Sequence, residues 1–223
     1  MKELCRKPHV DIYRHLAFAV VGGFFASYAI LCRMGVMANA QTMNLVELIL
    51  NALSGDGHTV LLHLGSLAVY VLGTMLTVLL PHLFHWDPRH VCPVISALSA
   101  IILALIPQNA PTIPALYPIF FAMSFQWSSF TGADGYYSST IFSTNNTKQT
   151  SLALAEYFCH RDQTQLRKAR LFGLTLLCFH VGVAYAFLTV KLFNTIASLA
   201  ILPVIIWCYL LVRCEDASVE THV

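Results

Sequence analysis

Charged residues are scarce in this chain. Only 11% of its 223 residues are Asp, Glu, Lys or Arg, and 57% are hydrophobic, whereas about 25% of the residues in a soluble domain are charged. The few charges gather in short segments between long uncharged runs, and no block of like charge or basic aromatic patch is present. These absences exclude an ordinary soluble globule and a nucleic-acid partner, and they favour a multi-pass membrane protein.

The chain also lacks the short motifs that accompany common chemistries. It has no G-x-S-x-G, P-loop, dinucleotide fingerprint or H-E-x-x-H, and its seven cysteines form no C-x-x-C pair. Residues 82–92 hold three histidines, an aspartate and a cysteine, but Pro88 interrupts the helical spacing that a zinc site would need. We therefore expect a protein that is not an enzyme and that needs no cofactor and no metal.

Six uncharged, apolar stretches are long enough to cross a bilayer. A hydrocarbon core about 30 Å thick needs roughly 20 residues of helix. We predict an all-α membrane protein with one transmembrane domain over residues 1–223 and six transmembrane helices. The predicted helices cover residues 16–32, 60–80, 91–106, 113–130, 171–190 and 193–212.

Lysine and arginine are distributed unequally between the predicted loops. Positive residues near membrane spans are retained on the cytoplasmic side. If the N-terminus is cytoplasmic, eleven of the thirteen Lys and Arg residues fall on that side, and only Arg33 and Lys191 fall outside. We therefore predict a protein of the inner (plasma) membrane with both termini in the cytoplasm.

Two polar segments, each following an apolar stretch, resemble each other. They are QTMN at residues 41–44 and STNN at residues 143–146, and Thr42 and Thr144 lie 102 positions apart. The same offset carries the first three predicted spans close to the last three. Because three is odd, the halves at about residues 14–107 and 113–213 would enter the membrane from opposite sides, which predicts an inverted repeat.

The same segments carry a resemblance to a known family. The residues concerned are GGF at 22–24, MANAQTMNL at 37–45, QWSSF at 126–130 and STIFSTNN at 139–146. They resemble the paired signatures of the YoaK-like (DUF1275) membrane proteins, a family without an established function. The resemblance implies about six spans and a Thr-Gly-Asn signature in each half. Here Met43 and Asn145 replace the glycine, which would indicate a positive φ or a very close approach of another segment. Asn145 can still adopt a positive φ, whereas Met43 does so only with strain. Either the first half keeps a different turn, or close packing rather than the dihedral angle accounts for the family's glycine.

Side chains of the two polar segments are candidates for a binding site. We predict short helices over 45–53 and 151–158, with the preceding Thr and Asn residues as N-caps that direct helix N-termini toward a shared site near the two-fold axis. The alternative is that these side chains only cap the helices and hold the halves together. The predicted substrate-binding residues are Gln41, Thr42, Asn44, Glu47, Gln126, Thr144, Asn145 and Asn146.

These features favour a small secondary carrier or channel for a polar or anionic solute, and a non-transporting membrane scaffold or assembly protein is the alternative. The partners expected are the lipid bilayer and the solute, and self-association is left open. Of the acids near these segments, Glu47, Asp134 and Glu156, Glu47 is the best functional candidate because it lies three residues after Asn44 in an otherwise apolar run. First-turn pairing with the helix dipole is its other interpretation. His63 and His180 are the strongly titratable groups inside the predicted spans, and we interpret both as hydrogen-bonded packing residues.

Overall fold

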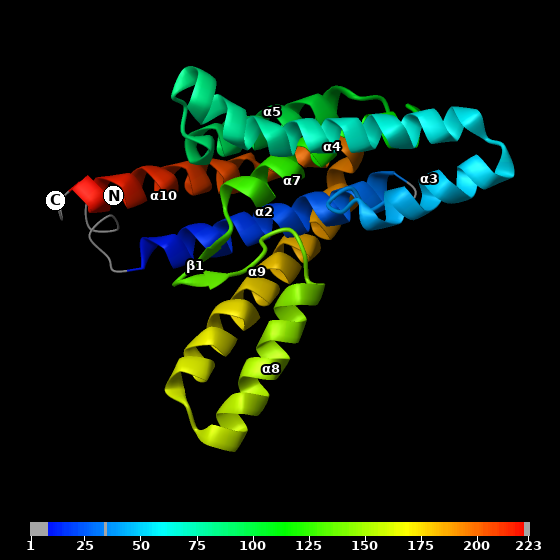
Figure 1. Cartoon of the computed structure of the whole chain (residues 1–223). Coiled ribbons are helices and arrows are strands. Elements are labelled where there is room, and N and C mark those ends of the chain that lie inside the picture. Colours follow the sequence, from blue (N-terminus) through cyan, green and yellow to red (C-terminus); the bar gives the residue numbers. More distant parts are fainter. Residues whose placement is uncertain (1–8, 34, 221–223) are drawn as a thin grey trace.

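Helices make up most of the computed structural model, which describes residues 9–33 and 35–220 (Figure 1). The elements in chain order are α2 (Val10–Cys32), α3 (Thr42–Ser54), α4 (Gly57–Phe84), α5 (Pro88–Leu105), α6 (Thr112–Ala115), α7 (Tyr117–Ser129), β1 (Gly132–Ala133), β2 (Tyr136–Tyr137), α8 (Thr144–His160), α9 (Gln163–Phe193), the 3-10 helix η1 (Asn194–Ile201) and α10 (Leu202–Glu220). In the described part of the chain, the strands form one short antiparallel hairpin. The helical class predicted from the sequence is therefore confirmed.

Within the described residues, four helical stretches are long and apolar enough to cross a membrane. They are α2, α4, α5 and a stretch, Gln163–Ala217, that runs through α9, η1 and α10. The predicted span 113–130 is divided between α6 and the 13-residue α7, because Pro118 has no N–H to continue the preceding turn. The predicted helix over 193–212 begins instead as the 3-10 helix η1. The first residue of η1, Asn194, has a φ of 53°.

Helix α2 lies in the middle of the molecule and crosses α9 at very short range (Figure 1). Glycines make this crossing possible, as small residues commonly do between membrane helices. A Cβ atom added to Gly23 would lie 1.9 Å from the carbonyl oxygen of Phe179, and one added to Gly182 would lie 2.1 Å from that of Val20. The backbones themselves are therefore in contact at this point.

Each of the short helices α3 and α8 lies beside the long helix that follows it. Figure 1 shows α3 alongside α4 and α8 alongside the first half of α9, and the two pairs extend from the central helices in different directions. An aspartate caps each long helix: the Asp56 side chain accepts from the Thr59 N–H, and the Asp162 side chain accepts from the Thr164 N–H. Helix α7 packs against α4 and α5, whereas α2 packs against α9 and α10.

Candidate functional site

A cavity of about 730 Å³ lies where the starts of α3 and α8 come together. The two polar segments found in the sequence both reach it, although they are about a hundred residues apart. Four aromatic side chains from α4, α7, α9 and the segment before α8 contribute to its walls, namely Tyr70, Trp127, Phe179 and Phe142. Its polar lining comes from Gln41, Thr42, Ser143, Thr144, Asn145 and Lys148.

Both helices begin at the cavity earlier than predicted, and without side-chain caps. Helix α3 begins at Thr42 and α8 at Thr144, and the residues that precede them, Gln41 and Ser143, form no capping hydrogen bond through their side chains. The expected capping role of the Thr and Asn residues is therefore wrong, because they belong to the first helical turns. Uncapped N-terminal amides leave a partial positive charge of about half a unit at each helix start.

The paired asparagines are buried packing residues outside the cavity lining. Asn44 is 2% exposed and its Nδ2 donates to the carbonyl oxygen of Ala40 at 3.0 Å. Asn146 is fully buried, and its Nδ2 donates to the corresponding carbonyl oxygen of Phe142 at 3.2 Å and to that of Ser139 at 2.7 Å. Each amide thus fixes the turn that leads into its helix, which is the structural role that the sequence left as an alternative.

The positions at which the family signature has glycine need no special backbone here. Met43 and Asn145 both lie in the first turn of a helix, and neither has a positive φ. The Met43 side chain is 54% exposed, so close packing does not restrict it either. The structure therefore shows no positive φ at either position and no close packing at Met43.

Two buried amides connect segments that are far apart in the sequence. The Gln126 Nε2 donates to the carbonyl oxygen of Phe18 at 3.1 Å and to the Thr140 Oγ1 at 2.9 Å. The Asn39 Nδ2 donates to the carbonyl oxygens of Gly22 at 2.9 Å and Ile141 at 3.3 Å. Gln126 was predicted to bind solute, but it does not line the cavity. Asn39 was missed, although its position inside the quoted 37–45 segment was a signal.

Glu47 also lies outside the cavity lining. It is the sixth residue of α3, so the first-turn role considered for it does not apply. Its Oε2 lies 3.4 Å from the Nε2 of His63, a buried residue of α4. The structure therefore brings Gln41, Thr42, Thr144 and Asn145 together and separates them from Asn44, Glu47, Gln126 and Asn146.

Lys148 lines the cavity but was not among the predicted site residues, although the sequence contains a signal for it. It follows Thr144 by four positions, and residues four apart lie on the same face of a helix. The aromatic walls carried no comparable signal, because aromatic side chains also fill ordinary bundle cores.

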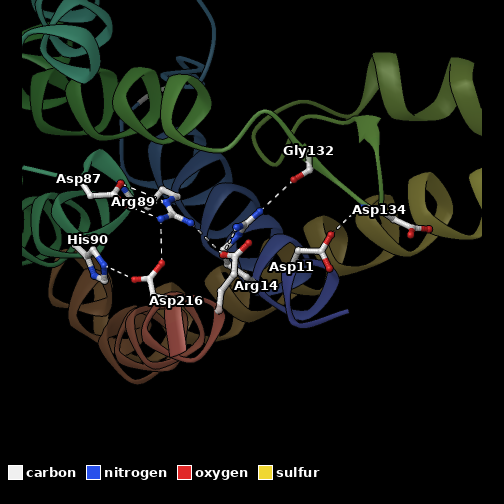
Figure 2. Close-up of polar contacts among 9 residues, drawn as sticks. Asp11, Arg14, Asp87, Arg89, His90, Gly132, Asp134 and Asp216 are labelled. Carbon is white, nitrogen blue, oxygen red and sulfur yellow. Dashed lines mark hydrogen bonds and ion pairs between the residues drawn. The ribbon is translucent and has the colours of Figure 1, made fainter. Parts of the chain in front are cut away.

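A network of charged side chains joins four segments at another place in the molecule (Figure 2). Arg14 of α2 is 6% exposed, forms an ion pair with Glu215 of α10 and donates to the carbonyl oxygen of Gly132 at 3.2 Å. Its guanidinium carbon also lies 5.0 Å from the centre of the Phe130 ring. A buried charge of this kind is tolerated because each neighbouring group offsets its loss of water.

Arg89 at the start of α5 extends this network. Its NH2 atom donates to Asp87 Oδ2 at 2.7 Å and to Asp216 Oδ1 at 2.9 Å, and the Nε2 of His90 lies 2.6 Å from Asp216 Oδ2. Potential ligand atoms of Asp87, His90 and Asp216 lie within 4.8 Å of one another. The arginine already occupies the two carboxylates, so the arrangement has the chemistry of an ion-pair network.

The Asp87 carboxyl gives the network a pH dependence. Burial raises its pKa, but hydrogen bonds from Arg89 and the charge of that guanidinium outweigh burial and hold the pKa below its ordinary value of 3.8. The stabilisation is therefore complete above about pH 4 and is lost as the pH falls through the lowered value. We expect Asp87→Asn to unfold more easily than the wild type at pH 6, and the difference to shrink below pH 4, as measured by unfolding in mixed micelles. A difference that stays constant down to pH 3 would contradict this.

The fold and the cavity define a mostly helical protein with several apolar helices of membrane-spanning length, in which the starts of α3 and α8 share one pocket. The chain belongs to the family described as "Protein of unknown function (DUF1275)", whose model matches residues 15–212. This confirms the family expected from the repeated segments. No curated protein and no solved structure matches the chain.

Proposed function

We propose that the protein is a small-solute carrier or channel of the membrane and that the cavity between α3 and α8 holds the solute. The observation that carries this proposal is the meeting of two uncapped helix starts at one cavity. Amide groups at helix N-termini and the ammonium of Lys148 favour a polar or anionic solute. No catalytic group is assigned to the cavity, and we propose that the solute passes through unchanged.

An inverted repeat of two three-span halves, about residues 14–107 and 113–213, is part of the proposal. In this repeat α2 corresponds to α7, α4 to α9 and α5 to α10. The packing of α2 against α9 then corresponds to the packing of α7 against α4, and that of α2 against α10 to that of α7 against α5. All four contacts are present. Exchange of α3 with α8 likewise relates the hydrogen bond from Asn44 to the carbonyl oxygen of Ala40 to the one from Asn146 to that of Phe142. In carriers built this way, one half moves against the other around a site at their interface.

Six spans with both termini in the cytoplasm of a plasma (inner) membrane complete the proposed topology. Arg14, Arg89, Gly132 and Glu215 come from four segments that this topology assigns to the cytoplasmic side, and they meet in one network. Arg33, assigned to the other side, donates to the carbonyl oxygens of Pro107 and Gln108, which share its assignment. The bilayer is the proposed partner.

A thermal-shift screen in lipid nanodiscs tests the proposed function. We expect at least one small polar or anionic solute to raise the melting temperature, because a ligand that binds only the folded state stabilises it by about 2.7 kcal/mol at a hundred times its Kd. The double variant Thr42→Val with Thr144→Val should lose this shift, since it removes two cavity hydroxyls at constant shape. Thr77→Val, at a half-buried threonine of α4 outside the cavity lining, should keep it.

The scaffold alternative makes the opposite forecast. The carrier proposal is rejected if three results are found together. These are that no solute stabilises the protein, that liposomes containing it show no solute flux, and that it forms a defined oligomer. If a solute binds but the threonine variants retain the full shift, the site is not at this cavity.

A further inference from the structure

Helix α4 presents one polar face to the protein and otherwise exposes apolar residues. In the 28 residues of α4, the buried ones are His63, Ser66 and Gly73. Tyr70, seven positions after His63, is half-buried and lines the cavity. Residues spaced by three, four and seven lie on the same side of a helix, so the polar face runs from His63 to the cavity wall, about 10 Å away at 1.5 Å per residue.

His63 pairs with an acid in a part of the molecule where acids are otherwise rare. Its side chain is 2% exposed, and its Nε2 lies 3.4 Å from the Oε2 of Glu47 on α3. Its Nδ1 has no hydrogen-bond partner among the described residues. The Glu47 side chain is 33% exposed, so the pair joins a buried imidazole to a partly exposed carboxylate. Titratable groups inside membrane spans usually serve transport of ions or protons.

Hydrogen bonds connect this pair to the cavity. The Ser66 Oγ donates to the carbonyl oxygen of His63 at 2.8 Å, and the Gln41 Nε2 donates to the carbonyl oxygen of Ser66 at 3.4 Å. Gln41 lines the cavity and immediately precedes α3, the helix that carries Glu47. The pair and the cavity are therefore connected through the same two helices.

The other titratable groups near His63 are few. From α3 the facing group is Glu47, and from the start of α7 it is Tyr117, whose hydroxyl donates to the carbonyl oxygen of Leu62 at 2.9 Å. Helix α5 packs weakly against α4, and no ion pair or hydrogen bond links a charged group of α5 to His63 in the described part of the chain. Along α4 itself, the nearest titratable neighbours are His58 and Tyr70, five and seven positions away.

We infer that His63 and Glu47 form a proton-binding site whose occupancy is coupled to the shape of the solute cavity. This inference rests on the proposed function, which it extends by naming the proton as the coupling ion. A proton from water adds to the free nitrogen lone pair of the neutral imidazole, and the Glu47 carboxylate balances the new charge. The pair then attracts more strongly and draws α3 toward α4, whereas loss of the proton weakens that attraction.

Trp127, which lines the cavity, reports this coupling without any solute. In a background of Trp86→Phe and Trp207→Phe, Trp127 is the single tryptophan, and its emission is followed in nanodiscs from pH 5 to pH 8, the range in which histidines titrate. We expect a sigmoidal shift in the wild-type background and its complete loss in His63→Gln. Glu47→Gln should weaken the shift, because a neutral amide no longer attracts the protonated imidazole.

His180→Gln is the matched control. His180 is exposed on α9 and lies outside the cavity lining, so its removal should leave the transition unchanged. Circular dichroism and melting temperature separate loss of coupling from loss of fold, and Glu47→Gln provides a second variant if His63→Gln does not fold. A flat Trp127 response in the folded wild-type background, or a transition that persists in His63→Gln, would overturn the inference.

The two proposals fail in different ways. If a solute raises the melting temperature but Trp127 does not respond to pH, the protein binds solute without this proton site. If Trp127 responds through His63 but no solute binds, the proton site stands and the carrier proposal does not.

Discussion

Gly182→Ala is expected to destabilise the protein by about 3 kcal/mol, the upper end of the usual range for overpacking. Its new methyl group would lie 2.1 Å from the carbonyl oxygen of Val20 and 2.9 Å from the N atom of Phe24. Both contacts are with backbone, so no flexible side chain can move aside, and α9 must separate from α2. Unfolding in mixed micelles followed by circular dichroism measures the loss.

Gly173→Ala is the control on the same helix. A Cβ at Gly173 would meet the Thr150 Cγ2 at an ordinary 3.7 Å, and alanine is about 1 kcal/mol more favourable than glycine in a helix interior. We expect this variant to be as stable as the wild type or slightly more stable. Equal stability of the Gly182 and Gly173 variants would show that the α2–α9 crossing is looser than described.

Arg14→Gln should remove about 3 kcal/mol from the free energy of unfolding, since it removes the buried partner of Glu215. The Arg89 Nη1, 3.7 Å from the same carboxylate, offsets only part of this loss. The Arg14 and Glu215 side chains are 8% and 18% exposed. The variant also loses the contact between the guanidinium and the Phe130 ring. Chemical unfolding of the purified protein at neutral pH measures the change.

A surface ion pair provides the comparison. Glu156 and His160 lie 3.5 Å apart on α8, but their side chains are 58% and 72% exposed, and exposed pairs contribute little. Glu156→Gln should therefore leave the unfolding curve almost unchanged. If Arg14→Gln is equally mild, the network at this end of the bundle does not hold α2 to α10.

The sequence was sufficient to predict the helical membrane class and the two segments that line the cavity. The class followed from hydropathy, which lipid imposes on every span. The pairing of residues 41–44 with 143–146 followed from their repetition, and the structure places Thr42 and Thr144 at one cavity. Such repetition carries information about tertiary position that propensity alone lacks.

Details that depend on tertiary contacts were not predictable. Asn44 and Asn146 have the composition of either caps or ligands, and only the carbonyl groups beside them decide that they are packing residues. The Glu47–His63 and Arg14–Glu215 pairs join residues 16 and 201 positions apart, and one sequence contains no signal for such pairings. The division of 113–130 depended on how Pro118 is accommodated, which hydropathy does not report.

Photo-crosslinking from inside the cavity tests the central claim most directly. The photoreactive amino acid p-benzoyl-phenylalanine is placed at Thr42 in the native protein in liposomes, and mass spectrometry identifies the peptides joined to it after irradiation. Our account expects crosslinks to the segment at residues 141–148 of the other half, whereas the same group at Thr77 should give none there. Crosslinks from position 42 that are confined to residues 14–107 would contradict the account.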